Sequence, residues 1–214
     1  MTKRTKLWLS SLAIYSLFLF WYTDFSGPLS DEEVDHFVAT LNERNSTPET
    51  IAYIERFLRN DTGRQFLMLN NLDMADNPPD VEGAELGESA NQLMNRYMEH
   101  MYPELFKRAS HPVIFGQAVY SALDMVGIEN ATEMKKWSDG ALFRYRSRRT
   151  FMDIVANPNI EGRHEFKLAA LDKTIAYPIE TSLYFGDMRL LFGLILLTLT
   201  ALLDNIRLAR GRTG

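Results

Sequence analysis

Two apolar runs without charge, one near each end, constrain this 214-residue chain more than any other feature. The first run, Leu7–Tyr22, has 16 residues, and the second, Leu190–Leu203, has 14. A helix that crosses the roughly 30 Å hydrocarbon core of a bilayer needs about 20 residues. The first run reaches that length if Trp8, Trp21 and Tyr22 lie at the interfaces, where amphipathic aromatic rings are favoured. Both runs are therefore candidates for membrane spans.

We predict transmembrane helices over residues 7–25 and 183–206. A cleaved signal peptide is the alternative for the first, but no small-x-small cleavage site follows the run. A buried core helix is the alternative for the second, because 14 uncharged residues are few for a span. The longer window includes Arg189, whose stem can carry its charge to the headgroups. Because the run shows no polar helical face, which a surface helix of a soluble protein needs, a span is favoured.

Basic residues flank both runs on their outer sides, in the tails 1–6 and 207–214. Lys and Arg are retained on the cytoplasmic side of a membrane. The pattern therefore predicts a two-pass protein of a bacterial inner membrane, with both termini cytoplasmic and the central domain periplasmic. The first partner that it implies is the lipid bilayer.

The segment between the runs is acidic and contains no cysteine. Residues 23–187 hold 16 basic and 27 acidic side chains, a formal charge of −11. An acidic domain repels phosphate backbones, so nucleic acid is not an expected partner. The absence of Cys excludes a disulfide framework, a Cys-ligated zinc site and a Cys nucleophile. The sequence has no HxH or HExxH spacing, nucleophile elbow or Gly-rich phosphate loop, so it assigns no metal, cofactor or catalytic residue.

Caps, breakers and apolar spacing divide the central segment into two parts. Residues 30–60 predict a helical hairpin between membrane and domain, with helix starts at Ser30 and Thr47. Residues 64–181 alternate strands and helices, with a long loop over 71–87. The strands are expected at Phe66–Asn70, Pro112–Val119, Ala141–Tyr145 and Thr174–Ile179, and the helices at Ser89–Arg108, between Ser147 and Asn157, and at His164–Leu171. This βαββαβ order predicts an α+β, ferredoxin-like fold.

Three segments on these elements carry a family pattern: Phe66-Leu67-Met68-Leu69-Asn70, Trp137–Phe151 with its Tyr145-Arg146-Ser147-Arg148, and Asn157-Pro158. They resemble an uncharacterised ferredoxin-like family of the dimeric α/β-barrel superfamily. In that family a Met-Leu-Asn strand opens the domain, and a Trp precedes a strand that ends in Tyr-x-Ser-Arg. A helix containing a His, as His164 would be here, then leads to the final strand.

The resemblance covers residues 64–181. It implies that two sheets pair into a barrel across a two-fold axis, so that the protein is a homodimer. It also implies a place for ligands, because related superfamily members bind small organic molecules or haem between sheet and helices. The two anchors, the 30–60 hairpin and the 71–87 loop depart from the free-standing soluble form that is usual in the family, so a soluble relative's role need not transfer.

Two arginines are the first candidates for ligand binding. Side chains alternate across a strand, so Arg144 and Arg146 are expected on one face, opposite Phe143 and Tyr145. Two guanidinium groups lining a cleft suit a carboxylate or another anion. The alternative is that the two arginines pair with the many acids of the domain.

His111 and His164 are further candidates. A His beside a carboxylate can act as a general base, and a His on a pocket wall can ligate haem iron. His164 is followed by Glu165, but adjacent residues on a helix do not face each other. The alternative, which the isolated positions of both histidines favour, is a structural or exposed role.

Two classes of function follow from these features. The first is a non-catalytic, membrane-anchored module that acts as a scaffold, a sensor or an accessory subunit of a membrane complex. The second is an enzyme or carrier that holds a small anionic or aromatic ligand in a pocket near Arg144 and Arg146. The lack of a catalytic motif favours the first class.

Overall fold

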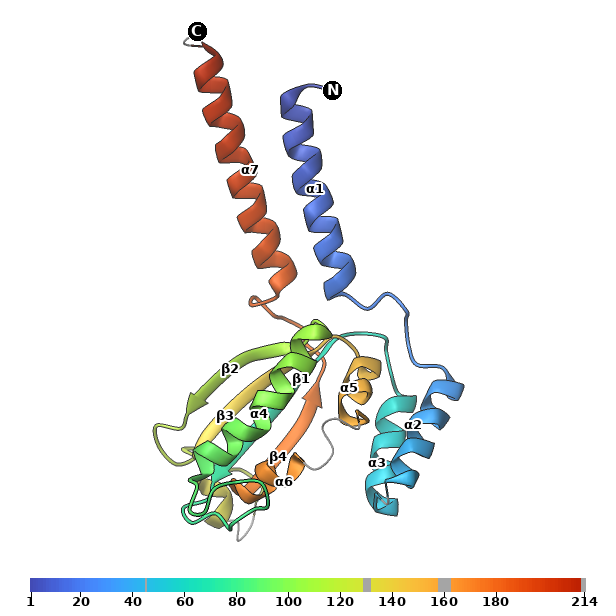
Figure 1. Ribbon diagram of the computed structural model, residues 1–214, viewed down its shortest axis with the longest axis vertical. Coiled ribbons are helices and arrows are strands. Elements are labelled where there is room, and N and C mark those ends of the chain that lie inside the picture. The colour runs from blue at the N-terminus through green and yellow to red at the C-terminus, as the bar shows by residue number, and fades with distance from the viewer. Residues whose placement is uncertain (45, 129–131, 158–162, 213–214) are drawn as a thin grey trace. The chain divides into compact units, whose positions relative to one another are not determined.

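A computed structural model describes the chain except for residues 45, 129–131, 158–162 and 213–214 (Figure 1). Pro158, which belongs to one of the family-like segments, lies outside the described residues. The chain forms two compact units, one of residues 1–25 with 181–214 and one of residues 26–180.

The first unit is a pair of long helices in contact, α1 (Lys3–Tyr22) and α7 (Met188–Arg212) (Figure 1). Both extend into the basic segments, so the predicted tails 1–6 and 207–214 are largely helical. Thr2 caps α1, with its side chain accepting a hydrogen bond from Thr5 N at 3.1 Å.

Among the described residues, one helix is long and apolar enough to cross a membrane by length and composition, Met188–Arg210. Length and composition therefore support the predicted span for the C-terminal helix only. Helix α1 is 20 residues long, but three serines and the basic residues Lys3, Arg4 and Lys6 lower its hydropathy.

The second unit contains a four-stranded sheet with the order β2-β3-β1-β4, in which all neighbours are antiparallel. The strands are β1 (Phe66–Met74), β2 (His111–Gln117), β3 (Asp139–Tyr145) and β4 (Leu171–Ile179). This strand order and the order of elements along the chain are those of a ferredoxin-like sheet. The predicted α+β class is confirmed.

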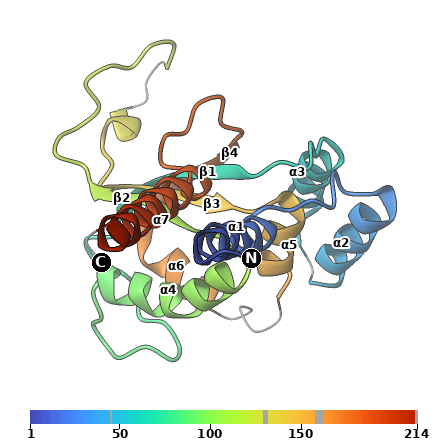
Figure 2. The ribbon, with the colours of Figure 1, turned by 90° about the horizontal axis from the view of Figure 1, so that it is seen from above.

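Helices α4 (Ala90–Lys107) and α6 (His164–Ala169) lie on one face of this sheet (Figure 2). Helix α5 (Arg148–Val155) follows β3, and a short 3-10 helix, η1 (Thr132–Lys135), lies in the β2–β3 connection. Ser147 caps α5 as predicted, and Ser89, predicted as the first residue of a helix, caps α4. Each accepts a hydrogen bond from the backbone N–H three residues on. The main core is built on Phe66, Met101, Leu105, Tyr145 and Ile154.

The predicted hairpin exists as α2 (Asp31–Glu43) and α3 (Pro48–Arg59), capped by Ser30 and Thr47. Its apolar faces form a second core, in which Met152 of α5 is fully buried. The buried residues of this core are Val34, Phe37, Leu41, Leu58 and Met152. The hairpin is therefore packed against the domain.

Strands β1, β3 and β4 are longer than predicted, and the expected helix at His164–Leu171 ends at Ala169. Asn71 to Met74, expected as loop, continue β1 because this central strand pairs with both neighbours. Asp73, for example, lies opposite Lys173 of β4 and 3.4 Å from its ammonium group. Pairing with the neighbouring strands thus keeps these polar residues in β1, although residues of their type favour turns in isolation.

Candidate functional site

A cavity of ≈160 Å³ lies between the sheet and α4, and Lys167 of α6 also lines it. Its wall is apolar and aromatic, because alternate residues of three strands face the helix. The lining includes Tyr97, Met98 and Met101 from α4 and Phe115, Phe143 and Tyr145 from the sheet. The cavity therefore suits a small, largely apolar molecule.

Lys167 is the cation of this cavity. Its Nζ lies 5.8 Å from the ring centroid of Tyr97, within cation–π range. Burial lowers the pKa of Lys167 and raises the pKa of Tyr97 to about 12. Burial also raises the pKa of Tyr145, the other phenol on the wall. The cavity thus offers an ammonium group and two neutral phenols, which can bind a carboxylate or a carbonyl oxygen.

His164 lies one turn before Lys167 on α6, at the edge of this cluster. Its ring centroid is 6.1 Å from that of Tyr97 in an edge-on arrangement. Partial burial and the charge of Lys167 lower the pKa of His164, so its neutral form is favoured. His164 is the one predicted site residue that the structure brings next to the cavity.

Arg144 lies on the other face of the sheet and is fully buried. Its Nε donates to Gln65 Oε1 at 2.7 Å, and its Nη1 donates to the carbonyl oxygen of Ala109. Both of these acceptors are neutral protein oxygens. These bonds join β3 to the segments that precede β1 and β2.

Arg146 and His111 are the other two candidates near Arg144. Arg146 follows the last residue of β3, so the alternation that predicted a shared face ends before it. Its backbone N–H donates to Ser110 Oγ at 3.1 Å. His111 pairs with Arg144 across β2 and β3, and its Nδ1 lies 2.9 Å from the carbonyl oxygen of Pro112.

The residues that sequence reasoning missed are Lys167 and Tyr97. A partial signal was present, because Lys167 follows His164 by one helical turn and Tyr97 lies on the apolar side of the predicted α4. Neither of these sequence positions predicts a cavity, because the cavity forms only where α4, α6 and the sheet pack together. In the portion of the chain that the structure describes, no group of three potential metal-ligating side chains occurs.

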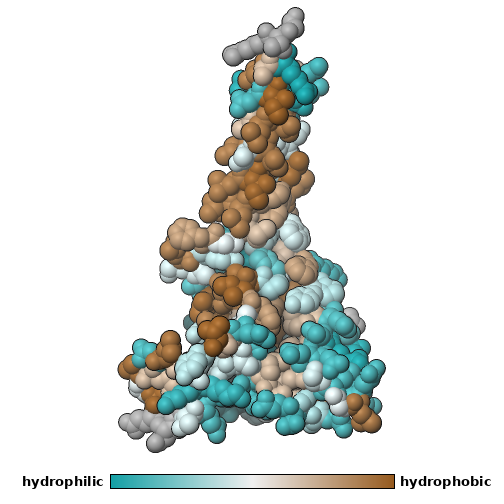
Figure 3. Space-filling view, turned by 90° about the vertical axis from the view of Figure 1, so that its left-hand side faces the viewer, coloured by the Kyte–Doolittle hydropathy of each residue, from teal (hydrophilic) through white to brown (hydrophobic). Residues whose placement is uncertain are grey.

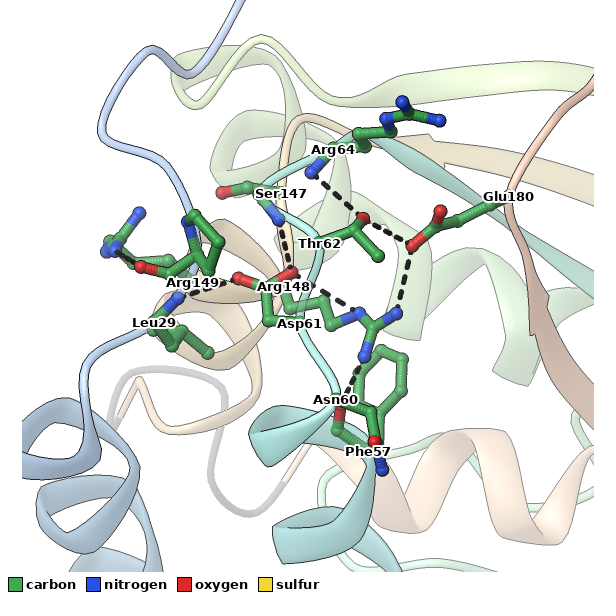
Figure 4. Close-up of polar contacts among 12 residues, drawn as sticks. Leu29, Phe57, Asn60, Asp61, Thr62, Arg64, Ser147, Arg148, Arg149 and Glu180 are labelled. Carbon is green, nitrogen blue, oxygen red and sulfur yellow. Dashed lines mark hydrogen bonds and ion pairs between the residues drawn. The ribbon is translucent and has the colours of Figure 1, made fainter.

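A second polar cluster is centred on Asp61, whose side chain is 1% exposed (Figure 4). Its Oδ2 accepts from Leu29 N at 3.0 Å, and its Oδ1 accepts from Gly63 N at 3.1 Å. Its Oδ1 also lies 3.5 Å from Arg148 Nε. Arg148 Nη2 in turn donates to Glu180 Oε1 at 3.0 Å. The cluster therefore joins Leu29, near the start of the unit 26–180, to Glu180 at its end.

Arg149 extends this cluster to α2. It forms a two-point ion pair with Glu33, at 2.6 Å and 3.0 Å. Its Nη1 donates to the carbonyl oxygen of Gly27 at 3.4 Å. Arg148 and Arg149 therefore bind acids and carbonyl groups of their own domain.

The face of the sheet opposite α4 and α6 carries apolar side chains, and we call it the open sheet face. It consists of Leu69, Ile114, Leu142, Ile175 and Tyr177, which neighbour one another in the strand register. Ile114, Ile175 and Tyr177 are 61%, 40% and 45% exposed. Contiguous exposed apolar area is a feature that interaction sites on proteins share.

Polar side chains join α1 and α7 within the helix pair. Asp204 is 5% exposed and accepts from Arg4 Nε at 2.9 Å and Trp8 Nε1 at 3.2 Å. The hydroxyl groups of Ser11 and Thr200 lie 2.7 Å apart. Buried polar groups are costly in an apolar medium unless they are paired, and here each has a partner on the other helix.

No protein-family model matches the chain, and no curated protein matches it. Among solved structures, the chain is similar to RPA0582, a protein of unknown function from Rhodopseudomonas palustris. The identity is 16% and the TM-score is 0.51, over 64% of this chain and 95% of that one. A structure of methylated RPA0582 gives 18% identity and a TM-score of 0.51, over 66% and 95%.

A dimeric ferredoxin-like protein of unknown function from Jannaschia sp. CCS1 is also similar. It has 16% identity and a TM-score of 0.29, over 55% of this chain and 99% of that one. A TM-score this low carries no argument. The likeness to RPA0582 supports the fold of the central domain.

Proposed function

We propose that the chain is a membrane-anchored, non-catalytic module that forms a homodimer through its open sheet face. In this role it acts as a scaffold, a sensor or an accessory subunit of a membrane complex. The observation that carries the proposal is the exposed apolar face of the sheet. Two copies of such a face, packed together, would remove Ile114, Ile175 and Tyr177 from water, each gaining up to about 1.5–3 kcal/mol before the cost of association.

The proposal includes two membrane passes, with both termini cytoplasmic and the domain periplasmic. By its composition alone, helix α1 has too many polar residues to be a membrane span. Its contacts with α7 reduce the free-energy cost of placing these polar residues in a bilayer. Arg4, Trp8 and Ser11 bond to Asp204 and Thr200 of α7. A pair of helices that satisfies its polar groups internally can occupy a bilayer where one of them alone would insert poorly.

Oligomeric state tests the dimer directly. Ile175→Asp places a charge on the open sheet face, and Leu168→Asp is the matched control, because Leu168 is 59% exposed on α6. Light scattering in detergent should find a dimer for the wild type and the control, and at least tenfold weaker association for Ile175→Asp. A monomeric wild type, or equal association of the two variants, would refute the dimer.

Reporter fusions test the topology. A reporter that is active only in the cytoplasm should be active at the C-terminus and inactive when inserted after Glu82, which lies on the 71–87 segment of the domain. Activity at both positions, or export of the C-terminal fusion, contradicts two passes with cytoplasmic ends.

A second candidate function, binding of a small anionic or aromatic ligand, is favoured by the cavity at Lys167. Mass spectrometry of the purified protein would show a retained small molecule. Lys167→Met should abolish its retention if the cavity holds it, whereas Arg146→Leu should do so if the ligand lies where sequence reasoning placed it. Retention by both variants, or no retained molecule in the wild type, removes this candidate.

A further inference from the structure

A second, wider cavity lies where α1 begins and α7 ends. Its volume is ≈810 Å³, and five cations line it: Lys3, Arg4 and Lys6 from α1, and Arg207 and Arg210 from α7. The two helices are far apart in sequence, and their packing brings the two basic segments to one place. Figure 3 shows the same division on one face, with apolar side chains along the helices and hydrophilic side chains at the end near the termini.

The charge of this cavity is strongly positive. Its one acid is Asp204, whose side chain is 7% exposed and already bound to Arg4. Five cations and one acid leave a formal charge of +4. Like charges that are held this close repel one another, so an anion in the cavity would relieve the repulsion.

The cavity is amphipathic as well as basic. Leu7 and Leu208 line it beside the cations, and both helices continue from there as apolar surface. A free phosphate ion would use the cations alone. A phospholipid would use both parts, with its phosphate among the cations and the start of its acyl chains against the leucines.

From these features we propose that the cavity binds the headgroup of an anionic phospholipid in the leaflet where these helix ends lie. The proposal rests on membrane insertion of both helices. Asp204 has a positioning role, because its bonds to Arg4 and Trp8 hold the ends of the helices together. The bound lipid would fix the pair at the membrane surface and shield its cations.

Native mass spectrometry of the full-length protein, with phosphatidylglycerol or phosphatidylcholine added to the detergent, tests the site. We expect phosphatidylglycerol to bind at least tenfold more tightly than phosphatidylcholine. Lys6→Gln with Arg207→Gln, one cation from each helix, should weaken phosphatidylglycerol binding about tenfold or more. The control, Arg56→Gln with Lys107→Gln, removes two exposed cations of the domain and should bind as the wild type does.

Several outcomes overturn the proposal. Equal binding of the two lipids would do so, as would equal loss in the two double variants. Competition by inorganic phosphate at a concentration comparable to that of the lipid would assign the cavity to a free anion instead. Because the measurement is made in detergent and does not depend on orientation, export of the C-terminal reporter, which would mean an inverted topology, would leave it valid. The topology and the lipid site can therefore fail separately.

Discussion

At the scale of single residues, Gly63 lies where two backbone segments approach closely. Its φ is +71°, and a Cβ atom there would lie 2.7 Å from the backbone carbon of Gly27. The segments 27–28 and 63 can therefore meet only because this residue has no side chain. Asp61 holds the same contact through its bonds to Leu29 N and Gly63 N.

Gly63→Ala should destabilise the domain by about 2–3 kcal/mol, since it adds a clash with backbone to the strain of positive φ. Gly87 is the matched control, because its φ is +75° and a Cβ atom added there would meet no other atom within 4 Å. Gly87→Ala should cost only the strain, about 1–2 kcal/mol. Urea unfolding of the detergent-solubilised protein measures both, and equal losses would show that the contact does not matter.

Glu33 makes the stability of the domain depend on pH in the acidic range. The hydrogen bond from Arg149, with that from Ser30 N, lowers the pKa of Glu33 from its ordinary value of 4.5 to about 2. The folded state therefore favours the carboxylate. Its stabilisation is complete above the ordinary pKa and is lost as pH falls from 4.5 toward 2.

The stability of the wild type should thus fall across that pH window, and Glu33→Gln should show a shallower fall. The difference will be modest, because the carboxylate is 38% exposed and water screens the pair. Thermal unfolding at pH 6, 4 and 2.5 would test this. Parallel curves for the two proteins would contradict the assignment.

Residue patterns predicted part of the candidate site. His164 was found because histidines are few, and it does lie beside Tyr97. Alternation along the strand gave the face of Arg144 but not what covers that face, and its guanidinium group bonds to Gln65 and Ala109. Lys167 was missed because a single Lys on a short helix has no signature before the helix is packed.

At the scale of elements, helix starts were predicted well and strand ends poorly. The caps at Ser30, Thr47, Ser89 and Ser147 act locally, so the sequence alone is sufficient to place them. Strand ends depend on partners. Asp139 belongs to β3 because it lies opposite Leu72, although the Asp-Gly pair favours a turn in isolation.

The pair of Asp73 and Lys173 stabilises the pairing of β1 with β4. Asp73 is 4% exposed, and one of its oxygens lies 3.4 Å from Lys173 Nζ. Lys173→Met should destabilise the protein by about 3–5 kcal/mol, because it leaves a buried carboxylate without its cation. Chemical unfolding measures this loss.

Asp73→Leu combined with Lys173→Met should recover much of that stability, since an apolar pair leaves no buried charge. A double variant that is as unstable as Lys173→Met alone would show that the packing of the lysine, 5.0 Å from the Trp137 ring centroid, matters more than its charge.

At the scale of the whole molecule, the chain consists of two compact units. The ferredoxin-like domain, its buried hydrophobic clusters and the hairpin all lie within residues 26–180. The fragment 26–180 should therefore fold alone and unfold cooperatively, with circular dichroism that shows both helix and strand. A fragment that unfolds without a transition would mean that α1 or α7 contributes to the domain's core.

The cluster around Asp61 and Arg148 has a consequence for how such a chain is assembled. It ties Leu29 and Glu180, through shared partners, into one network of bonds at the boundary of the unit. Insertion of one protein into a loop of another is tolerated where the guest's ends lie close together. Residues 26–180 satisfy this condition, with the helix pair as host, so the domain could be exchanged for another without redesigning the host helices.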